Sequence, residues 1–266
     1  MKTYVLYHAH CTDGFGAAYA AWKIYGDKAI YLPVKYDNPM PKLKQKSQVY
    51  IVDFSYPRQE LLDLASQMNE VIVLDHHKTA EEDLRDIDLS STPNLSITFD
   101  MEKSGAVLAW EHFFPNEEIP PLILHIQDKD LWRFDLKDTK KVIASLRSYD
   151  MNFELWDKFD LKRLITEGEA ILRFQNLTVE KLCKNMRLMK VGGHKVPAVN
   201  SSILQSEIGN RLCEKYPDSP FSVVYFDASD KTRYSLRSIG DFDVSLVAKT
   251  YGGGGHKNAA GYILRD

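Results

Sequence analysis

Short apolar runs alternate with amphipathic segments through the first half of the chain. Five runs rich in β-branched and aromatic residues are expected to be strands: 4–7, 29–34, 48–54, 70–77 and 95–100. Helical spacing of apolar residues predicts helices at 14–26, 58–68, 104–114 and 121–132. Strands that alternate with helices, and that are apolar almost throughout, predict a parallel sheet covered by helices on both faces.

The pattern changes after about residue 150. A charged and aliphatic stretch with helical periodicity, 154–187, predicts a long helix or a helix pair. Strands then follow strands, with hairpins expected at 186–200 and 221–240, a helix at 206–216, and a helix, a glycine loop and a strand across 244–264. We therefore expect an α/β domain at 1–153, a helical linker at 154–187 and a smaller α+β domain at 188–266.

Composition and charge narrow the class of protein. The chain has 266 residues, of which 44% are hydrophobic and 27% charged, as in a soluble globular protein with a substantial core. Its net charge of -3 argues against a large footprint on duplex nucleic acid, which usually needs a basic surface. A small anionic substrate held by a few local cations is compatible with this charge.

The cysteines and the amino-terminal stretch bear on the compartment. Cys11, Cys183 and Cys213 show neither metal-ribbon nor disulfide spacing, so reduced thiols are the simplest interpretation. The stretch "MKTYVLYHAH" turns polar too soon for a signal peptide, and no apolar run approaches membrane-spanning length. We expect a cytoplasmic protein with no membrane partner; a homodimer is left open.

Candidate chemistry gathers where the predicted strands end. These positions carry histidines, carboxylates and one thiol: His8, His10, Cys11 and Asp13 after the first strand, Asp53 after the third, Asp75, His76 and His77 after the fourth, and Asp128 and Asp130 in "LHIQDKD". Ligands of open parallel sheets bind beyond the carboxyl ends of the strands, so these groups are expected to converge. Histidines with carboxylates suit Mn²⁺, Mg²⁺, Fe²⁺ or Co²⁺. Two ions that share a carboxylate would use all of them, as in phosphoryl transfer.

Each of these residues also has a purely structural interpretation. An isolated Asp after a strand, such as Asp53, is usually a turn former or a helix cap, and a lone His8 is more often a packed residue. Three residues in a row, Asp75-His76-His77, after a buried strand are hard to explain by packing. The joint pattern therefore favours a metal site.

A second signal lies near the carboxyl end, in "YGGGGHKNAAGY". Glycines at 252–255 permit close approach of backbone N–H groups to an anion, and His256 follows them. A flexible linker is disfavoured because the small residues at 259–261 suit tight packing. Upstream, Arg237 in "SLRS" has the geometry to grip a phosphate, although a single such arginine is more often a solvated strand residue.

These motifs together resemble a known family. The segments "CTDGFGAA", "IVDF", "LDHH", "QDKD" and "GGGGHKNAAG", in this order, are similar to the DHH phosphoesterase superfamily with its C-terminal DHH-associated domain. The resemblance covers essentially the whole chain and implies an amino-terminal parallel α/β domain with two Mn²⁺ or Mg²⁺ ions. It implies metal ligands at His8, Asp13, Asp53, His76 and Asp128, with Asp53 as the bridge. It further implies that His77 contacts the scissile phosphate, that Asp75 orients its neighbours, and that substrate is held by Arg237, Ser238, Gly254, Gly255 and His256.

Two departures from the family pattern matter. Many members carry Asp-x-Asp-Gly in the first loop, where this chain has "CTDG", so Cys11 stands at the first Asp position. One metal position would then use the Cys11 thiolate or His10, and a softer ligand shifts preference from Mg²⁺ toward Mn²⁺ or Zn²⁺. The family's Asp-Thr-Gly near the last ligand is replaced by "QDKDLWRF", so Asp128 and Asp130 are both candidates.

The function that the resemblance and the residues imply is a metal-dependent phosphodiesterase of the exonuclease or oligoribonuclease type. Its expected substrates are short RNA or DNA oligonucleotides, or cyclic or linear dinucleotides, hydrolysed to mononucleotides. One alternative is an exopolyphosphatase or pyrophosphatase, which would need more cations than Arg237 and Lys257. Another is a catalytically weak nucleotide-binding protein, against which the full set of metal ligands argues.

Overall fold

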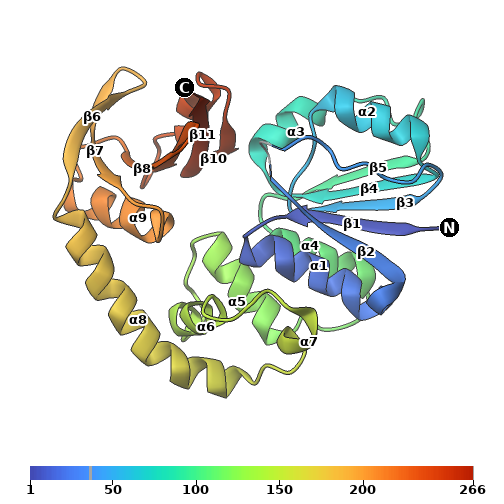
Figure 1. Cartoon of the computed structure of the whole chain (residues 1–266), viewed down its shortest axis with the longest axis horizontal. Helices are drawn as coiled ribbons and strands as arrows, with labels where there is room; N and C mark the ends of the chain where they lie inside the picture. Colours follow the sequence, from blue (N-terminus) through green and yellow to red (C-terminus); the bar gives the residue numbers. More distant parts are fainter. Residues whose placement is uncertain (36–37, 266) are drawn as a thin grey trace. The chain divides into compact units, whose positions relative to one another are not determined.

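The computed structural model describes residues 1–35 and 38–265. It divides into two compact units, Met1–Leu172 and Arg173–Asp266 (Figure 1). The boundary falls inside the long helix α8 (Leu161–Cys183), where the sequence pattern had led us to expect a separate linker at 154–187. Among the described residues, no helix combines the length and the apolar character needed to cross a membrane.

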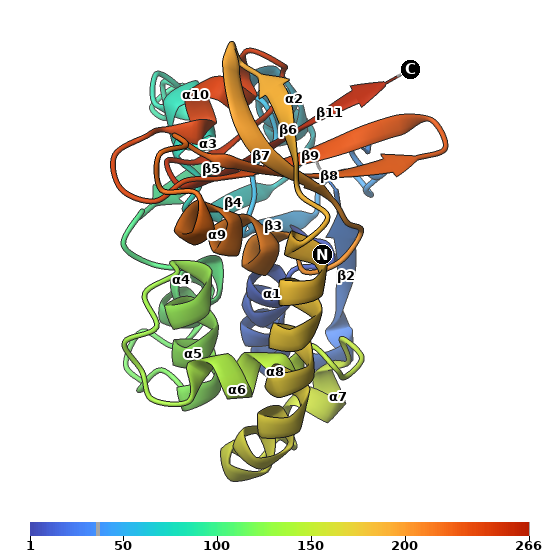
Figure 2. The ribbon, with the colours of Figure 1, turned by 90° about the vertical axis from the view of Figure 1, so that its left-hand side faces the viewer.

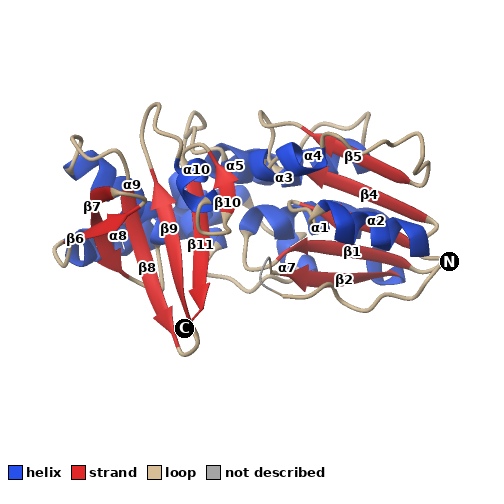
Figure 3. Ribbon diagram, turned by 90° about the horizontal axis from the view of Figure 1, so that it is seen from above, coloured by secondary structure: helices blue, strands red, loops and turns tan. Residues whose placement is uncertain are grey.

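The first unit is built on a five-stranded sheet with strand order β2-β1-β3-β4-β5. Its strands are β1 (Thr3–His8), β2 (Ala29–Val34), β3 (Gln48–Val52), β4 (Glu70–Asp75) and β5 (Leu95–Phe99). Every neighbouring pair is parallel, as Figure 3 shows. The prediction of an amino-terminal parallel α/β domain is confirmed.

Helices cover both faces of this sheet. They are α1 (Thr12–Tyr25), α2 (Arg58–Gln67), α3 (Lys78–Leu84), α4 (Gly105–Phe113), α5 (Pro121–Asp130), α6 (Thr139–Leu146) and α7 (Phe153–Trp156), with a 3₁₀ turn at Gly26–Lys28. Val5 packs in one core with α1 and α4, whereas its neighbour Leu6 packs in the other core with α2. Because alternate strand residues enter two different cores, the strands are apolar on both sides.

Some boundaries differ from the sequence-based prediction. The strands expected at 48–54 and 70–77 end two residues earlier, at Val52 and Asp75. Asp53 has a positive φ of 60°, which an extended strand does not accommodate. Helices α3 and α6 were not predicted, since both are short and α3 buries only Leu84.

The second unit holds a six-stranded sheet in the order β10-β11-β9-β8-β7-β6. Its elements are β6 (Arg187–Val191), β7 (His194–Asn200), α9 (Gln205–Lys215), β8 (Ser222–Ala228), β9 (Lys231–Arg237), α10 (Val244–Lys249), β10 (Gly254–His256) and β11 (Ala259–Arg265). The pair β7–β8 is parallel and the other pairs are antiparallel. The expected α+β domain is therefore confirmed as a mixed sheet.

Two helices cover opposite faces of this second sheet (Figure 2). Val223 packs in the core that contains α10, and its neighbour Val224 packs in the core that contains α9. The second core also takes Val179 and Cys183 from the end of α8. Part of the glycine run expected as a loop is the short strand β10, which pairs with β11.

Candidate metal centre

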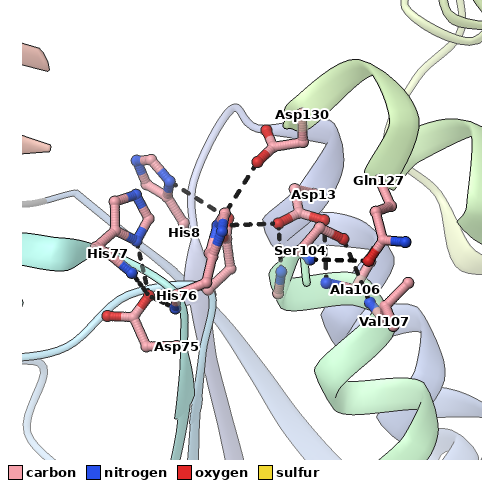
Figure 4. Close-up of polar contacts among 12 residues, drawn as sticks. His8, Asp13, Asp75, His76, His77, Ser104, Ala106, Val107, Gln127 and Asp130 are labelled. Atoms are coloured by element: carbon pink, nitrogen blue, oxygen red, sulfur yellow. Dashed lines mark hydrogen bonds and ion pairs between the residues drawn. The ribbon is translucent and has the colours of Figure 1, made fainter. Parts of the chain in front are cut away.

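The candidate centre lies at the carboxyl edge of the first sheet. Strands β1, β3 and β4 are neighbours, and the register places Tyr7 beside Val52 and Val52 beside Leu74. The residues that follow these positions therefore come together at one edge. Figure 4 shows His8, Asp75, His76 and His77 from these strand ends grouped with side chains from α1, α4 and α5.

Asp53 lies at the middle of this cluster. It is buried and its φ is 60°, a left-handed conformation that Asp, Asn and Gly tolerate better than other residues. Its Oδ1 lies 3.1 Å from His76 Nε2, and its Oδ2 lies 3.5 Å from His8 Nδ1. Oδ2 is buried and has no hydrogen-bond partner among the described residues. A buried carboxylate oxygen in this state is costly unless a cation compensates it.

His76 is surrounded by carboxylates. Its Nε2 lies 3.5 Å from Asp13 Oδ2 and 3.6 Å from Asp130 Oδ2, in addition to the contact with Asp53. The His76 ring is buried, as are Asp13 and Asp53. Three carboxylates around one imidazole nitrogen carry more negative charge than the imidazole can balance, which is the environment that binds a divalent cation.

The amino terminus of α4 holds Asp13 in place. Gly105 N donates to Asp13 Oδ2 at 2.6 Å and Ala106 N donates to Asp13 Oδ1 at 3.0 Å. These N–H groups have no partner within the helix, so a carboxylate is stabilised there. A Cβ on Gly105 would lie 2.5 Å from Asp53 Cβ, and a Cβ on Gly14 would lie 2.3 Å from the His8 carbonyl oxygen. Neither glycine was a sequence candidate, although each adjoins a polar residue at a helix start.

A carboxylate–imidazole pair lies beside this cluster. Asp75 is fully buried, and its Oδ1 accepts a hydrogen bond from His76 N at 2.8 Å. The same oxygen is 2.7 Å from His77 Nδ1. A carboxylate acceptor requires the proton on Nδ1, so Asp75 fixes the orientation of the His77 ring and makes Nε2 its second reactive nitrogen.

The donor atoms form overlapping groups. The ligand atoms of Asp13, Asp53 and His76 lie within 4.8 Å of one another, and so do those of His8, Cys11 and Asp53. Asp53 thus belongs to both groups. The exposed His10 joins neither group in the part of the chain that the structure describes.

Asp128 and Asp130 are placed differently. Asp128 accepts hydrogen bonds from Asp135 N at 2.8 Å and Leu136 N at 3.1 Å, and also from the Thr139 hydroxyl. These bonds anchor the segment after α5. Asp130 instead faces His76, as Figure 4 shows.

The charges of the cluster shift the pKa values of its members. Burial lowers the pKa of both imidazoles, but the adjacent carboxylates, Asp53 above all, outweigh burial and raise the pKa of His8 to about 11 and that of His76 to about 10. Burial acts to raise the pKa of Asp53, yet its contacts with the two histidines hold it well below the usual range. Burial and the Asp53 charge raise the pKa of Asp13 and of the Cys11 thiol. The metal-free cluster therefore retains protons that a bound cation would displace.

The second unit brings together part of its predicted substrate-binding set. In the sheet register Arg237 pairs with Ala259 and Ala259 pairs with His256, so Arg237 and His256 lie on one edge. Arg237 Nη2 donates to Ser206 Oγ at 2.7 Å. A Cβ on Gly209 would lie 2.7 Å from Arg237 Cγ, so this glycine lets α9 pack against the arginine.

The other members of that set have structural contacts. Ser238 is buried, and its Oγ donates to the Phe242 carbonyl oxygen at 2.7 Å and accepts from Asn258 Nδ2 at 2.9 Å. Gly254 pairs with Gly261 in the ladder between β10 and β11. Gly255 has a φ of 136°, and a Cβ there would lie 2.6 Å from the Ala259 carbonyl oxygen. The Gly255 site therefore requires glycine for the fold itself.

Comparison with known proteins identifies the family. Residues 2–126 match the model of the DHH family, N-terminal domain, and residues 195–266 match that of the DHHA1 domain. The two matches follow the order of the two units. The chain belongs to the DHH phosphoesterase superfamily, as its motifs predicted.

Individual relatives extend this result. The chain is 35% identical over 284 residues to uncharacterized protein R106 of Acanthamoeba polyphaga mimivirus, with 97% of this chain and 66% of that protein covered. It is 28% identical over 228 residues to the oligoribonuclease NrnB of Bacillus subtilis (strain 168), with 74% and 53% covered. The chain thus spans about two thirds and about half of the lengths of these relatives. The structure of RecJ in complex with Mn²⁺ from Thermus thermophilus has a TM-score of 0.54 at 15% identity, covers 100% of this chain and 50% of RecJ, and shows the fold alone.

Proposed function

We propose that this chain is a metal-dependent phosphodiesterase that hydrolyses short oligonucleotides or dinucleotides to mononucleotides. One observation carries the proposal: Asp53 is shared by two groups of metal-ligating side chains, Asp13–Asp53–His76 and His8–Cys11–Asp53. A shared carboxylate between two donor groups is the arrangement that two-metal phosphoryl transfer requires.

The donor set fits two divalent cations. Its members are buried or half-buried, combine imidazole with carboxylate, and include the Asp53 Oδ2 atom that lacks a hydrogen-bond partner among the described residues. We propose as ligands His8, Asp13, Asp53, His76 and Asp130. Asp130 takes the place expected for Asp128, because Asp128 is engaged with the segment after α5. Bound divalent cations supply a water of lowered pKa and positive charge against the phosphate oxygens.

Asp75 and His77 have roles that follow from their contact. The Asp75 carboxylate accepts from Nδ1 of His77, so a ring protonated on both nitrogens has its Nε2–H available for a phosphate oxygen. Asp75 stabilises that protonated ring, and burial of the pair fixes its direction. We propose that His77 contacts the scissile phosphate and that Asp75 positions it.

The second unit supplies groups suited to holding the substrate. The Arg237 guanidinium presents several donors in a planar fork, and its bond to Ser206 Oγ limits its rotation. His256 lies on the same sheet edge. We propose that Arg237 and His256 bind a substrate phosphate, while Ser238, Gly254 and Gly255 shape that edge.

Two observations favour short oligonucleotides as the substrate. A relative that matches 74% of this chain is an oligoribonuclease. The net charge of -3 disfavours the broad electrostatic grip that long duplexes need. Both observations support a substrate of a few nucleotides.

The test is a hydrolysis panel with the purified chain. Dinucleotide to pentanucleotide RNA, matched DNA, cyclic dinucleotides, pyrophosphate and polyphosphate are incubated with Mn²⁺ or with a chelator, and products are separated by chromatography. We expect mononucleotides from the short RNAs with Mn²⁺ alone. The variant Asp53→Asn, whose side chain tolerates the positive φ, should lose more than about a hundredfold in rate, since changes even outside the ligand shell cost up to that much. Faster turnover of pyrophosphate or polyphosphate than of every oligonucleotide would refute the proposal.

A further inference from the structure

The thiol of Cys11 lies in the metal centre without any other evident task. Cys11 is the N-cap residue of α1, with φ -115° and ψ 134°, and its side chain makes no capping hydrogen bond. Its Sγ, a His8 ring nitrogen and an Asp53 carboxylate oxygen all lie within 4.8 Å of one another. Ser, Thr, Asp or Asn would cap the helix better. Capping therefore does not account for a cysteine at this position.

The other two cysteines show what a structural thiol looks like in this chain. Cys183 is buried in an apolar core with Val179 and Ile208. Cys213 is buried and donates from Sγ to the Arg237 carbonyl oxygen at 3.1 Å. Cys11 is only half-buried and belongs to none of the apolar cores of the described residues. Apolar packing therefore does not account for Cys11 either.

We propose that Cys11 is a thiolate ligand and that the two metal positions are chemically unlike. The position formed by His8, Cys11 and Asp53 takes a thiophilic ion of the Zn²⁺, Co²⁺ or Fe²⁺ class. The position formed by Asp13, Asp53 and His76, with Asp130 nearby, takes an oxygen-preferring ion such as Mn²⁺ or Mg²⁺. This inference rests on the two-metal centre of the proposed function and names the ion that each half prefers.

Ligand chemistry separates the two positions. Sulfur is a soft ligand that selects zinc and similar ions, whereas Mg²⁺ and Mn²⁺ prefer carboxylate and water oxygens. Three carboxylates surround His76, but near His8 the only carboxylate of the group is the shared Asp53. A neutral thiol and an imidazole would leave that half with too little negative charge for a dication. On metal binding the Cys11 Sγ–H bond breaks, the proton passes to solvent, and the sulfur lone pair forms the bond to the metal.

Cobalt tests the assignment directly, because a thiolate bound to Co²⁺ gives a sulfur-to-metal charge-transfer band in the near ultraviolet. The full chain, freed of metal, is titrated with Co²⁺ while bound cobalt and absorbance are followed together. We expect two cobalt ions per chain, with the band complete at one of them. Zn²⁺ should abolish the band by displacement, and a large excess of Mg²⁺ should not.

Three variants sharpen the experiment. Cys11→Ser should lose the band and bind Zn²⁺ roughly tenfold or more weakly, in line with changes around metal ligands. Cys11→Asp should lose the band but bind Mg²⁺ more tightly than the unmodified chain. The matched control Cys183→Ala, which removes a thiol from the apolar core, should keep the band.

Each contrary result has one meaning. Two bound cobalt ions without a band in the unmodified chain would overturn the thiolate assignment and leave the two-metal centre standing. A band that persists in Cys11→Ser would do the same. Failure to bind any cobalt would overturn the thiolate assignment together with the proposed function. The spectrum of the unmodified chain decides the question even if a variant fails to fold.

Discussion

Two aspartates at the end of α5 show how one residue step decides a role. Asp128 and Asp130 are two positions apart, so they project about 200° from each other around the helix. Asp128 anchors a segment in which Trp132, Phe134 and Asp138 all have positive φ values between 55° and 69°. Such backbone persists only where its surroundings hold it, and Asp128 provides that support. Asp130 is left to face His76.

Substitution should separate these roles. Asp128→Asn should lower the free energy of unfolding by about 2–3 kcal/mol, because hydrogen bonds to a charged acceptor are lost or weakened. Asp130→Asn should leave Tm nearly unchanged and weaken Mn²⁺ binding by roughly tenfold or more. Calorimetric melting and titration of both variants are the measurements. If Asp128→Asn loses Mn²⁺ affinity at unchanged Tm, the two roles are reversed.

The sequence could predict the residues at strand ends but not those that support them. His8, Asp53 and His76 converge because neighbouring parallel strands end together, and an alternating strand–helix pattern reveals that arrangement. No comparable rule tells which of Asp128 and Asp130 faces the cluster, because that depends on the phase of α5. The exposure of His10 depends on its positive φ of 59°, which the residue type does not reveal.

At the scale of elements, the centre depends on how closely α4 approaches β3. Ser104 Oγ caps α4 by accepting from Val107 N, and the next residue, Gly105, donates to Asp13. Gly105 leaves no room for a Cβ beside Asp53. A residue without a side chain thus sets the distance between a helix terminus and the shared carboxylate.

Adding one methyl group should therefore damage the centre from outside. Gly105→Ala should lower the free energy of unfolding by about 1–3 kcal/mol through overpacking and should also weaken Mn²⁺ binding. The matched control is Gly168→Ala in α8, where a Cβ would lie 2.0 Å from the Lys141 carbonyl oxygen, away from the metal ligands. It should lose comparable stability and keep its Mn²⁺ affinity. Equal effects of both variants on Mn²⁺ binding would contradict this account.

The element pattern of the sequence was sufficient for both sheets and insufficient for short helices. Strands such as β3 and β4 are continuous apolar runs, and the hairpins of the second unit follow one another directly. Helix α3 carries too few buried residues to show a helical period, and its position after His77 is set by tertiary packing. The strand β10 was hidden because glycines rarely form strands, and it exists through its pairing with β11.

At the scale of the whole molecule, each unit has its own hydrophobic cores and the proposed ligands all belong to the first unit. All four tryptophans, at positions 22, 110, 132 and 156, also belong to the first unit. Tryptophan fluorescence therefore reports unfolding of the metal-binding unit selectively.

Mn²⁺ should raise the melting temperature seen by tryptophan fluorescence. A ligand at about 100 times its Kd stabilises the state that binds it by about 2.7 kcal/mol, and this gain should appear in the first unit. Scans with Mn²⁺ and with a chelator are compared, and Asp53→Asn serves as the control that should not respond. A fluorescence transition that ignores Mn²⁺ in the unmodified chain would mean that the ligands lie elsewhere.

The division of roles between the units gives a kinetic prediction. Arg237→Gln should lower kcat/KM for short RNA by about ten- to a hundredfold, the value of a hydrogen bond to a charged group, while Mn²⁺ affinity stays the same. Arg233→Gln, two residues before the strand position of Ser235 on β9 and exposed, is the matched control and should have little effect. A parallel loss of Mn²⁺ affinity in Arg237→Gln would show that the arginine does not act through substrate.

The crowding around Asp53 has a consequence for how this protein can change by mutation. Gly14 and Gly105 each leave no room for a Cβ beside the Asp53 carboxylate or the strand end next to it, although the three positions are far apart along the chain. A substitution at any one of them alters what the other two can accept, so their effects should not add. The three codons form one epistatic block, and accessible evolutionary paths leave all three unchanged while surrounding positions drift. A random library of this gene should therefore recover functional variants at most surface positions and almost none at these three.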